Sequence, residues 1–217
     1  MNPAPLRARA LSPLLAPLLA PLLAVVLVLG VSPAAAQGAG DAAARARIGA
    51  AAPEVQLTDL DGDVHRLSTY RGKVVVLEWI APDCPYVAKH HVRYDTVRDL
   101  VQKFSDREVV WLAIASRSAA DAAALGERAE TWGLPFPVLL DPDGEVAETY
   151  GAHATPHVFV IDTGGVLRYS GAIDDDWSHD RLGAVNYLDM ALSTLLAGRR
   201  IERTVTIPYG CPIRARN

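Results

Sequence analysis

The sequence predicts an α/β fold with a central, mostly parallel β-sheet flanked by helices. Apolar runs of strand length at 74–80, 109–115 and 137–140 alternate with amphipathic helical patterns. Strands that are apolar on both faces are typical of a parallel sheet covered by helices on both sides, with right-handed crossovers. About 180 residues follow the N-terminal apolar stretch, which suits one domain with a sizeable core.

The elements can be assigned in chain order. Strands at 55–57 and 64–67 flank Asp61-Gly62, a tight-turn dipeptide, and predict an N-terminal β-hairpin. The remaining expected elements are strand 74–80, helix 85–104, strand 109–115, helix 119–132, strand 137–140, a short helix 145–150, an antiparallel hairpin of strands 157–161 and 166–169, and a last helix 182–196. A C-terminal extension follows this helix.

The N-terminal residues 1–36 are typical of an export signal. Arg7 and Arg9 precede an apolar stretch at 11–31, and three alanines end at Ala36 before Gln37. We expect cleavage near Ala36 and a periplasmic mature protein; the alternative is a retained membrane anchor. The predicted organisation is signal peptide 1–36, flexible linker 37–47, domain 48–198, and tail 199–217 carrying Cys211.

The charge of the chain excludes some partners. It has 21 basic and 25 acidic residues, for a net charge of −4. Cleavage removes Arg7 and Arg9 and no acidic residue, which lowers the net charge to about −6. We therefore expect no nucleic-acid partner and no stable membrane association after signal cleavage.

Cys84 is the leading candidate for chemistry. The strand at 74–80 leads through Ala81-Pro82-Asp83 to this cysteine, and Pro85 begins a helical pattern. Unpaired backbone N–H groups and the helix dipole favour a thiolate at a helix N-terminus, and the thiolate is the nucleophilic form. The alternative is a small buried hydrophobic residue that happens to precede a helix.

Two segments resemble a known family. Residues 73–85 are similar to the first central strand and active-site loop of the thioredoxin superfamily, in its peroxiredoxin-like (AhpC/TSA, redoxin) branch, and Thr155-Pro156 is similar to its cis-proline loop. The resemblance covers about 48–198 and implies a thioredoxin fold. It also implies that Pro156 is cis and lies against Cys84, where the preceding backbone receives an extended thiol partner.

The motif departs from its best-known relatives. Thioredoxins carry Cys-x-x-Cys, but Val87 stands three residues after Cys84. When the peroxiredoxin pattern Pro-x-x-x-Thr-x-x-Cys is aligned with this loop, Ile80, Cys84 and Val87 stand at its three fixed positions. The sequence therefore does not contain the motif that forms the peroxidase pocket. The chain is more similar to a peroxiredoxin-like subgroup with one loop cysteine and a C-terminal Tyr-Gly-Cys motif, present here at 209–211.

Cys211 suggests a redox partner for Cys84. An exported chain with two cysteines is more often bonded between them than left with two free thiols. We expect a reversible Cys84–Cys211 disulfide, for which the tail must fold back to the active-site loop. A permanent structural bridge, or a tail whose Cys211 meets other molecules, are the alternatives.

Other titratable residues are secondary candidates. His90 or Lys89 could assist proton transfer to the leaving thiolate, or could be exposed residues of a helix face. Glu78 is costly to bury unpaired and could be a proton relay, or could pair with an Arg or Lys. His157 follows the predicted cis-proline and could border the cleft or cap a strand.

The acidic segment 174–176 with His179 could recruit a divalent cation, although solvated loop charge is the stronger interpretation because no ligand spacing is recognisable. We expect no cofactor.

The resulting prediction is an exported thiol-disulfide oxidoreductase. Cys84 attacks a disulfide or a peroxide, Cys211 resolves the intermediate, and an external thiol reductant resets the enzyme. The expected partners are a disulfide-containing protein, or a small thiol or peroxide substrate. The alternatives are a thiol peroxidase with antioxidant activity, a periplasmic copper-binding protein and a non-catalytic binding module.

Overall fold

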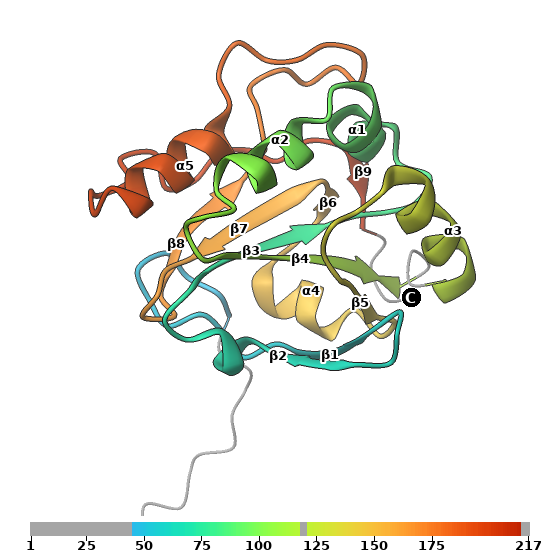
Figure 1. Cartoon of the computed structure of the whole chain (residues 1–217), viewed down its shortest axis with the longest axis horizontal. Helices are drawn as coiled ribbons and strands as arrows, with labels where there is room; N and C mark the ends of the chain where they lie inside the picture. The colour runs from blue at the N-terminus through green and yellow to red at the C-terminus, as the bar shows by residue number, and fades with distance from the viewer. Residues whose placement is uncertain (1–44, 118–120, 214–217) are drawn as a thin grey trace, which may run out of the picture. The chain divides into compact units, whose positions relative to one another are not determined.

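A seven-stranded mixed sheet forms the centre of the protein (Figure 1), in the strand order β2-β1-β5-β4-β3-β7-β8. The computed structural model describes residues 45–117 and 121–213, so the expected signal peptide and most of the expected linker lie outside the described residues. The strands of this sheet are β1 (Gln56–Asp59), β2 (Val64–Arg66), β3 (Val74–Trp79), β4 (Val109–Ser116), β5 (Val138–Asp141), β7 (His157–Ile161) and β8 (Leu167–Gly171).

The predicted α/β class is confirmed, and the parallel pairing is confined to the middle of the sheet. β3 runs parallel to β4, and β4 runs parallel to β5. The outer pairings are antiparallel: β1 with β2 and β5, and β7 with β3 and β8. Both expected hairpins are present and lie at the two edges, so the sheet as a whole is mixed.

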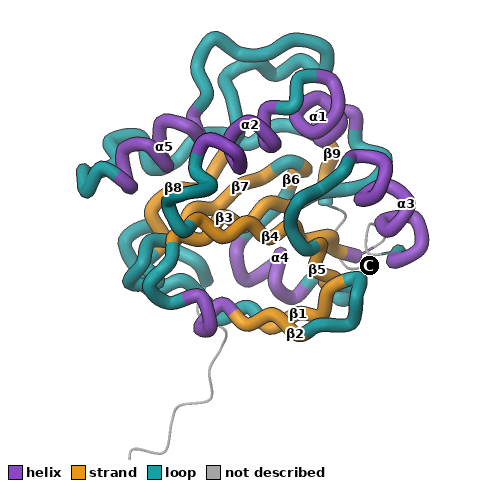
Figure 2. Tube along the Cα trace, in the orientation of Figure 1, coloured by secondary structure: helices purple, strands orange, loops and turns teal. Residues whose placement is uncertain are grey.

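Helices cover both faces of this sheet (Figures 1 and 2). One face carries α2 (Thr96–Lys103), α3 (Ala122–Trp132) and α5 (Tyr187–Leu196), and the other carries α4 (Glu145–Tyr150). Val74 and Val76 of β3 pack toward α2 and α5, whereas the alternate residues Val75 and Leu77 pack in the core that contains α4. This alternation is the period-two pattern of a strand buried on both sides.

The prediction of a single helix at 85–104 is wrong, because the structure divides this segment into three parts. α1 (Pro85–Ala88) is followed by a π-helical turn (Lys89–Arg93), and α2 begins only after Asp95, whose φ is 49°. A π-helical turn adds a residue to the helix and is often found at functional sites. Here it allows three consecutive polar residues, Lys89, His90 and His91, to be buried together.

Two other helices begin later than expected. α3 begins at Ala122, where the Asp121 carboxylate accepts hydrogen bonds from two backbone N–H groups of the first turn, each at 3.0 Å. α5 begins at Tyr187 with Asn186 as its N-cap, five residues after the predicted start. Residue 185 is held outside the helix because its backbone exchanges hydrogen bonds with Asp175.

The C-terminal tail folds back across the domain. It runs beside β8, where the Ser170 N–H and carbonyl bond the backbone of Thr204 and Thr206. It ends in β9 (Cys211–Pro212), which pairs with β6 (Ala154–Thr155) in a separate two-stranded sheet. Sequence reasoning expected the return of the tail but did not predict this second sheet. Among the residues described, no helix is long and apolar enough to cross a bilayer.

Candidate active site around Cys84 and Cys211

Cys84 stands where the first central strand turns into α1. Its backbone N–H donates to the Ala81 carbonyl at 3.2 Å, and its own carbonyl accepts from the Ala88 N–H at 3.0 Å, so the residue caps the helix. The residue is only 2% exposed and packs in a cluster with Ile80 and Val87. The position of Cys84 at a helix N-terminus is therefore confirmed, on a helix of one turn.

The cis-proline loop lies directly against this cysteine. The Thr155–Pro156 peptide bond is cis, as the resemblance implies. The Cys84 Sγ donates a hydrogen bond to the Thr155 carbonyl oxygen at 3.0 Å. The loop thus holds the thiol through a backbone acceptor.

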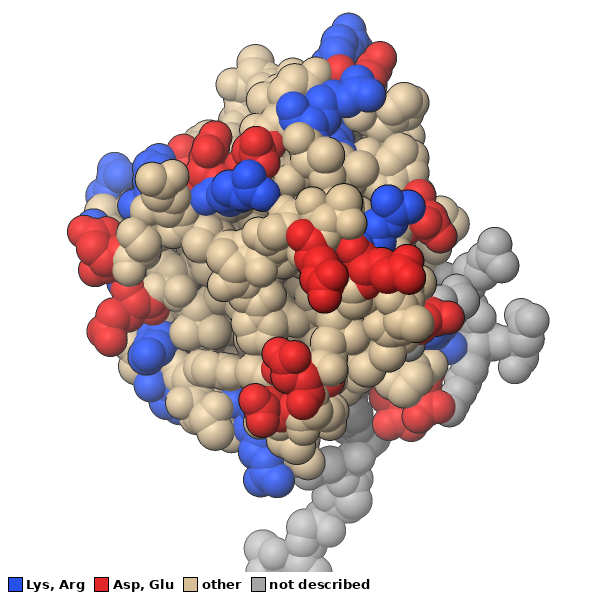
Figure 3. All heavy atoms as spheres, turned by 45° about the vertical axis from the view of Figure 1, so that its right-hand side comes forward, with Lys and Arg blue, Asp and Glu red and all other residues tan. Residues whose placement is uncertain are grey.

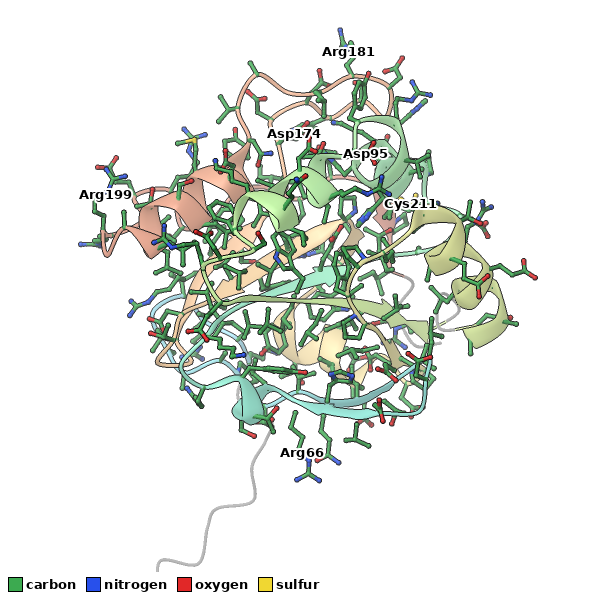
Figure 4. The ribbon with its side chains drawn as sticks, viewed as in Figure 1. Arg66, Asp95, Asp174, Arg181, Arg199 and Cys211 are labelled. Atoms are coloured by element: carbon green, nitrogen blue, oxygen red, sulfur yellow. The ribbon has the colours of Figure 1, made fainter. Side chains whose placement is uncertain are left out.

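The tail brings the second thiol to the same place. β9 runs antiparallel to β6 with Cys211 opposite Thr155, and the Thr155 hydroxyl donates to the Cys211 carbonyl at 3.3 Å. Cys211, labelled in Figure 4, is partly exposed and packs against the cluster that contains Cys84. Both thiols are free. Burial, followed by contact with the Cys84 thiol, raises the pKa of Cys211 to about 12.

Each residue of the Tyr-Gly-Cys motif has a separate structural role. The Tyr209 hydroxyl donates to the Asp174 carboxylate, which anchors the tail two residues before Cys211. Gly210 has a φ of 135°, and a Cβ at this position would overlap the Thr155 carbonyl oxygen. Only glycine therefore lets the tail approach the cis-proline loop this closely, with Cys211 as the next residue.

The anchor of Tyr209 belongs to a buried polar group that we call the tail cluster: Lys89, His90, Asp174 and Tyr209. The Lys89 ammonium lies 3.1 Å from each Asp174 carboxylate oxygen, 2.7 Å from the Asp176 carbonyl and 3.0 Å from the Tyr209 hydroxyl. His90 Nε2 lies 3.1 Å from that hydroxyl. Asp174, labelled in Figure 4, comes from the loop between β8 and α5.

The tail cluster overturns two expectations. Lys89 and His90 are fully buried, so the exposed-helix alternative is wrong. Asp174 is also buried, so the interpretation of 174–176 as solvated loop charge is wrong for this residue. Burial is the main cause that lowers the pKa of His90 to about 3, and burial together with the Asp174 carboxylate raises the pKa of Tyr209. Sequence reasoning missed the link between Lys89, Asp174 and Tyr209.

Glu78 and His91 form a second buried polar pair, which we call the sheet cluster. The His91 Nε2 lies 2.9 Å from the Glu78 Oε1, and the imidazole stacks on Trp132 with ring centroids 5.7 Å apart. The other carboxylate oxygen, Oε2, has no hydrogen-bond partner among the described residues. The partner of Glu78 is thus a histidine, in place of the expected Arg or Lys.

His157 lies on β7 opposite Trp79 of β3. Its Nε2 is 3.1 Å from the Ser170 hydroxyl, and its ring packs on Phe159 with centroids 4.4 Å apart. Burial, aided by neighbouring His153, lowers the pKa of His157 to about 3. This histidine is packed as a neutral core residue.

No metal centre is evident in the described part of the chain, where no group of three or more His, Cys, Asp or Glu side chains could hold an ion. The acidic segment is engaged in local structure, since Asp175 accepts from the Val185 N–H and Asp176 from the Ser178 N–H. Lys, Arg, Asp and Glu side chains are interspersed on the face shown in Figure 3, without a large patch of one sign.

Comparisons with known proteins agree with this geometry. The AhpC/TSA family model matches residues 48–170. The thiol-disulfide oxidoreductase ResA of Geobacillus kaustophilus is 31% identical over 128 residues, which are 56% of this chain and 67% of that protein. A putative peroxiredoxin of Mycobacterium tuberculosis is 30% identical over 126 residues, 58% of this chain and 76% of that protein.

Solved structures are similar over a longer stretch. An uncharacterized conserved protein from Geobacillus kaustophilus has a TM-score of 0.70 and 30% identity, over 78% of this chain and 93% of the other. A hypothetical protein from Sinorhizobium meliloti has a TM-score of 0.67 and 25% identity, over 77% and 93%. The family match spans more than half of the chain, and the site has a cysteine against a cis-proline: the chain belongs to the AhpC/TSA family, in the peroxiredoxin-like branch of the thioredoxin superfamily, and is a thiol-dependent oxidoreductase.

Proposed function

We propose that this protein is an exported two-cysteine thiol-disulfide oxidoreductase, in which Cys84 is the nucleophile and Cys211 the resolving thiol. The observation that carries the proposal is the pairing of β9 with β6, which brings the only two cysteines of the chain into contact beside the cis-proline. The identity of 31% to a thiol-disulfide oxidoreductase supports the same class of reaction.

The reaction has two exchange steps. The Cys84 thiolate attacks one sulfur of a substrate disulfide, the S–S bond breaks, and the other sulfur leaves as a thiolate that takes up a proton. The Cys211 thiolate then attacks Cys84 in the mixed disulfide and releases the second substrate thiol. The substrate is reduced by two electrons, and the protein is left with a Cys84–Cys211 disulfide. Two external thiols restore the dithiol and are themselves joined in a disulfide.

The electrostatics of Cys211 support this order of attack. A thiol with a pKa of about 12 is protonated at neutral pH, so Cys211 is a poor first nucleophile. Two of the causes that raise this pKa, the hydrogen bond with Cys84 and its charge, disappear once Cys84 is in a mixed disulfide. Cys211 therefore becomes more reactive after the first step than before it.

The other predicted site residues have supporting roles in this proposal. Thr155 supplies the carbonyl that accepts from Cys84 and aligns Cys211 through its backbone, and Pro156 fixes that carbonyl beside the thiol. His90 is a positioning residue that acts through the Tyr209 hydroxyl. Glu78, which is buried in the sheet cluster with His91, is the candidate proton relay.

Intact-mass analysis with thiol alkylation tests the two-cysteine mechanism. Addition of one equivalent of a small disulfide to the reduced protein is expected to remove both alkylation sites and lower the mass by two hydrogens, without dimer formation. Cys211→Ser is expected to stop at a mixed disulfide on Cys84, and Cys84→Ser to keep its remaining thiol alkylatable. Two thiols that persist through oxidant would contradict the mechanism. The same spectrum tests export, since a cleaved chain lacks residues 1–36.

A thiol peroxidase is the second candidate, supported by the identity of 30% to a putative peroxiredoxin. In that reaction the Cys84 thiolate would attack a peroxide oxygen and form a sulfenic acid, water or an alcohol would leave, and Cys211 would condense with the sulfenic acid to a disulfide and water. Hydrogen peroxide in place of the disulfide separates the two activities. Peroxidase function requires that Cys84 is oxidised orders of magnitude faster than a free thiol.

A further inference from the structure

Strand β9 pairs with the edge of β6, the strand whose Thr155 carbonyl accepts a hydrogen bond from the Cys84 thiol. β6 pairs with β9 through Ala154–Pro212 and Thr155–Cys211, in antiparallel register. An open strand edge next to a nucleophile is where an extended polypeptide would add by backbone hydrogen bonding. The tail lies as such a polypeptide would lie, with its own cysteine at the position where a substrate cysteine would meet Cys84.

The tail is fixed on both sides of this strand. Before it, the Tyr209 hydroxyl is held in the buried tail cluster, and its ring packs edge-on to Tyr86 of α1 with centroids 5.9 Å apart. After it, the Ile213 N–H donates to the His153 carbonyl at 3.0 Å. With the tail in this position Cys84 is 2% exposed, so a small disulfide reaches its sulfur through a local opening, whereas an extended polypeptide must also displace β9. An extended substrate and β9 cannot occupy the edge of β6 together.

We infer, on the basis of the proposed function, that β9 is a built-in competitor for the peptide-binding edge of the active site, so that Cys84 exchanges with small disulfides and excludes polypeptide disulfides while the tail is docked. Gly210 determines this specificity because its missing side chain permits the close approach to Thr155. Tyr209 is the positioning residue that keeps β9 paired with β6. The exchange itself is the first step described above: Cys84 gains a bond to one substrate sulfur, and the other leaves as a thiol.

The test measures one step with two matched substrates. In a Cys211→Ser background Cys84 is the only thiol, and the β9 backbone can still pair with β6. Glutathione and an unstructured cysteine-containing peptide, each activated with the same nitrothiobenzoate leaving group, differ only in the chain that must fit. Release of the chromophore gives the rate of mixed-disulfide formation for each, and their ratio cancels any change in the reactivity of Cys84.

Gly210→Ala is expected to lift β9 from Thr155. The peptide rate should rise by about tenfold or more, whereas the glutathione rate should change by less than about threefold. Gly198→Ala is the matched control, because Gly198 also has a positive φ, 68°, but a Cβ there would meet nothing within 4 Å. Tyr209→Phe, which removes the hydroxyl and keeps the ring, should give an intermediate rise and serves as a second variant if Gly210→Ala does not fold.

Two results would overturn the inference while leaving the proposed function intact. One is that glutathione and the peptide react at equal rates in the Cys211→Ser protein, and the other is that both rates rise equally in Gly210→Ala and Tyr209→Phe. Release of no chromophore from either substrate in any variant would instead refute Cys84 as a nucleophile. The two failures are therefore distinguishable.

Discussion

The tail cluster and the sheet cluster both include residues of the same π-helical turn, yet they connect this turn to different parts of the molecule. Lys89 of the tail cluster bonds residues 85 and 120 positions away, in the loop after β8 and in the tail. His91, two residues later, bonds Glu78 only 13 positions away on β3. One cluster therefore holds the segment that carries Cys211, and the other fixes the turn onto the sheet.

The clusters also differ in how completely their charges are satisfied. The Lys89 ammonium has a carboxylate, a carbonyl and a hydroxyl around it, and the Asp174 carboxylate also accepts from the backbone N–H groups of Asp176 and Gly183. Among the described residues, one carboxylate oxygen of Glu78 in the sheet cluster has no partner, whereas in the tail cluster the atom without a partner is Nδ1 of the uncharged His90. This contrast indicates that the tail cluster is a closed ionic site, in which loss of either charge leaves the other buried without compensation.

The largest expected effect is therefore that of Asp174→Asn. The substitution leaves the Lys89 ammonium buried without its counter-ion, and the free energy of unfolding should fall by about 3–5 kcal/mol. Urea denaturation measures this change. The tail should also loosen, so that alkylation of the reduced Cys211 becomes faster.

Asp106→Asn serves as the control for Asp174→Asn, since Asp106 is exposed on the surface and its substitution should change stability by less than about 0.5 kcal/mol. If Asp174→Asn cost no more than this control, the tail cluster would not be a closed ionic site.

The second largest effect should be the contribution of His90 to the pH dependence of stability. Because the pKa of His90 is lowered to about 3, the folded protein keeps it neutral while the unfolded chain binds a proton below about pH 6.5. Stability is thus lost as the pH falls from about 6.5 toward 3, by up to about 1.4 kcal/mol per pH unit for this residue. In His90→Gln the slope of unfolding free energy against pH should be shallower by that amount.

A second histidine provides a comparison for this experiment. His157 has its pKa lowered in the same direction, so His157→Gln should flatten the slope to a similar degree without loosening the tail. An unchanged slope in His90→Gln would mean that His90 is not neutral within the tail cluster.

The sheet was predictable from the sequence because its signals are local. The apolar run of β3, the Asp61-Gly62 turn and the hairpin of β7 and β8 each lie within a few residues of the structure that they specify. The division of the helix at 85–104 was not predictable in this way. The π-helical turn buries Lys89 against Asp174, a contact between residues 85 positions apart that no local pattern signals.

The same distinction applies to the site. Cys84 and Pro156 were found because each belongs to a motif with a fixed local context, and the structure brings them together as expected. The tail cluster had only weak signals: a tyrosine beside Gly210-Cys211 and an aspartate in an acidic run. A lysine, an aspartate and a tyrosine on three separate segments have no shared spacing, so only the fold reveals that they form one buried group.

The smallest expected effect concerns the sheet cluster. Glu78→Gln keeps the shape of the side chain and an oxygen to accept from His91, but replaces a charge-assisted hydrogen bond with a neutral one, which should cost about 1 kcal/mol of unfolding free energy. If this cluster only fixes the π-helical turn onto β3, the rate of mixed-disulfide formation at Cys84 should stay within about twofold of the parent rate. A rate about tenfold lower at neutral pH, with stability changed no further, would instead assign Glu78 to proton transfer and would join the two clusters in one mechanism.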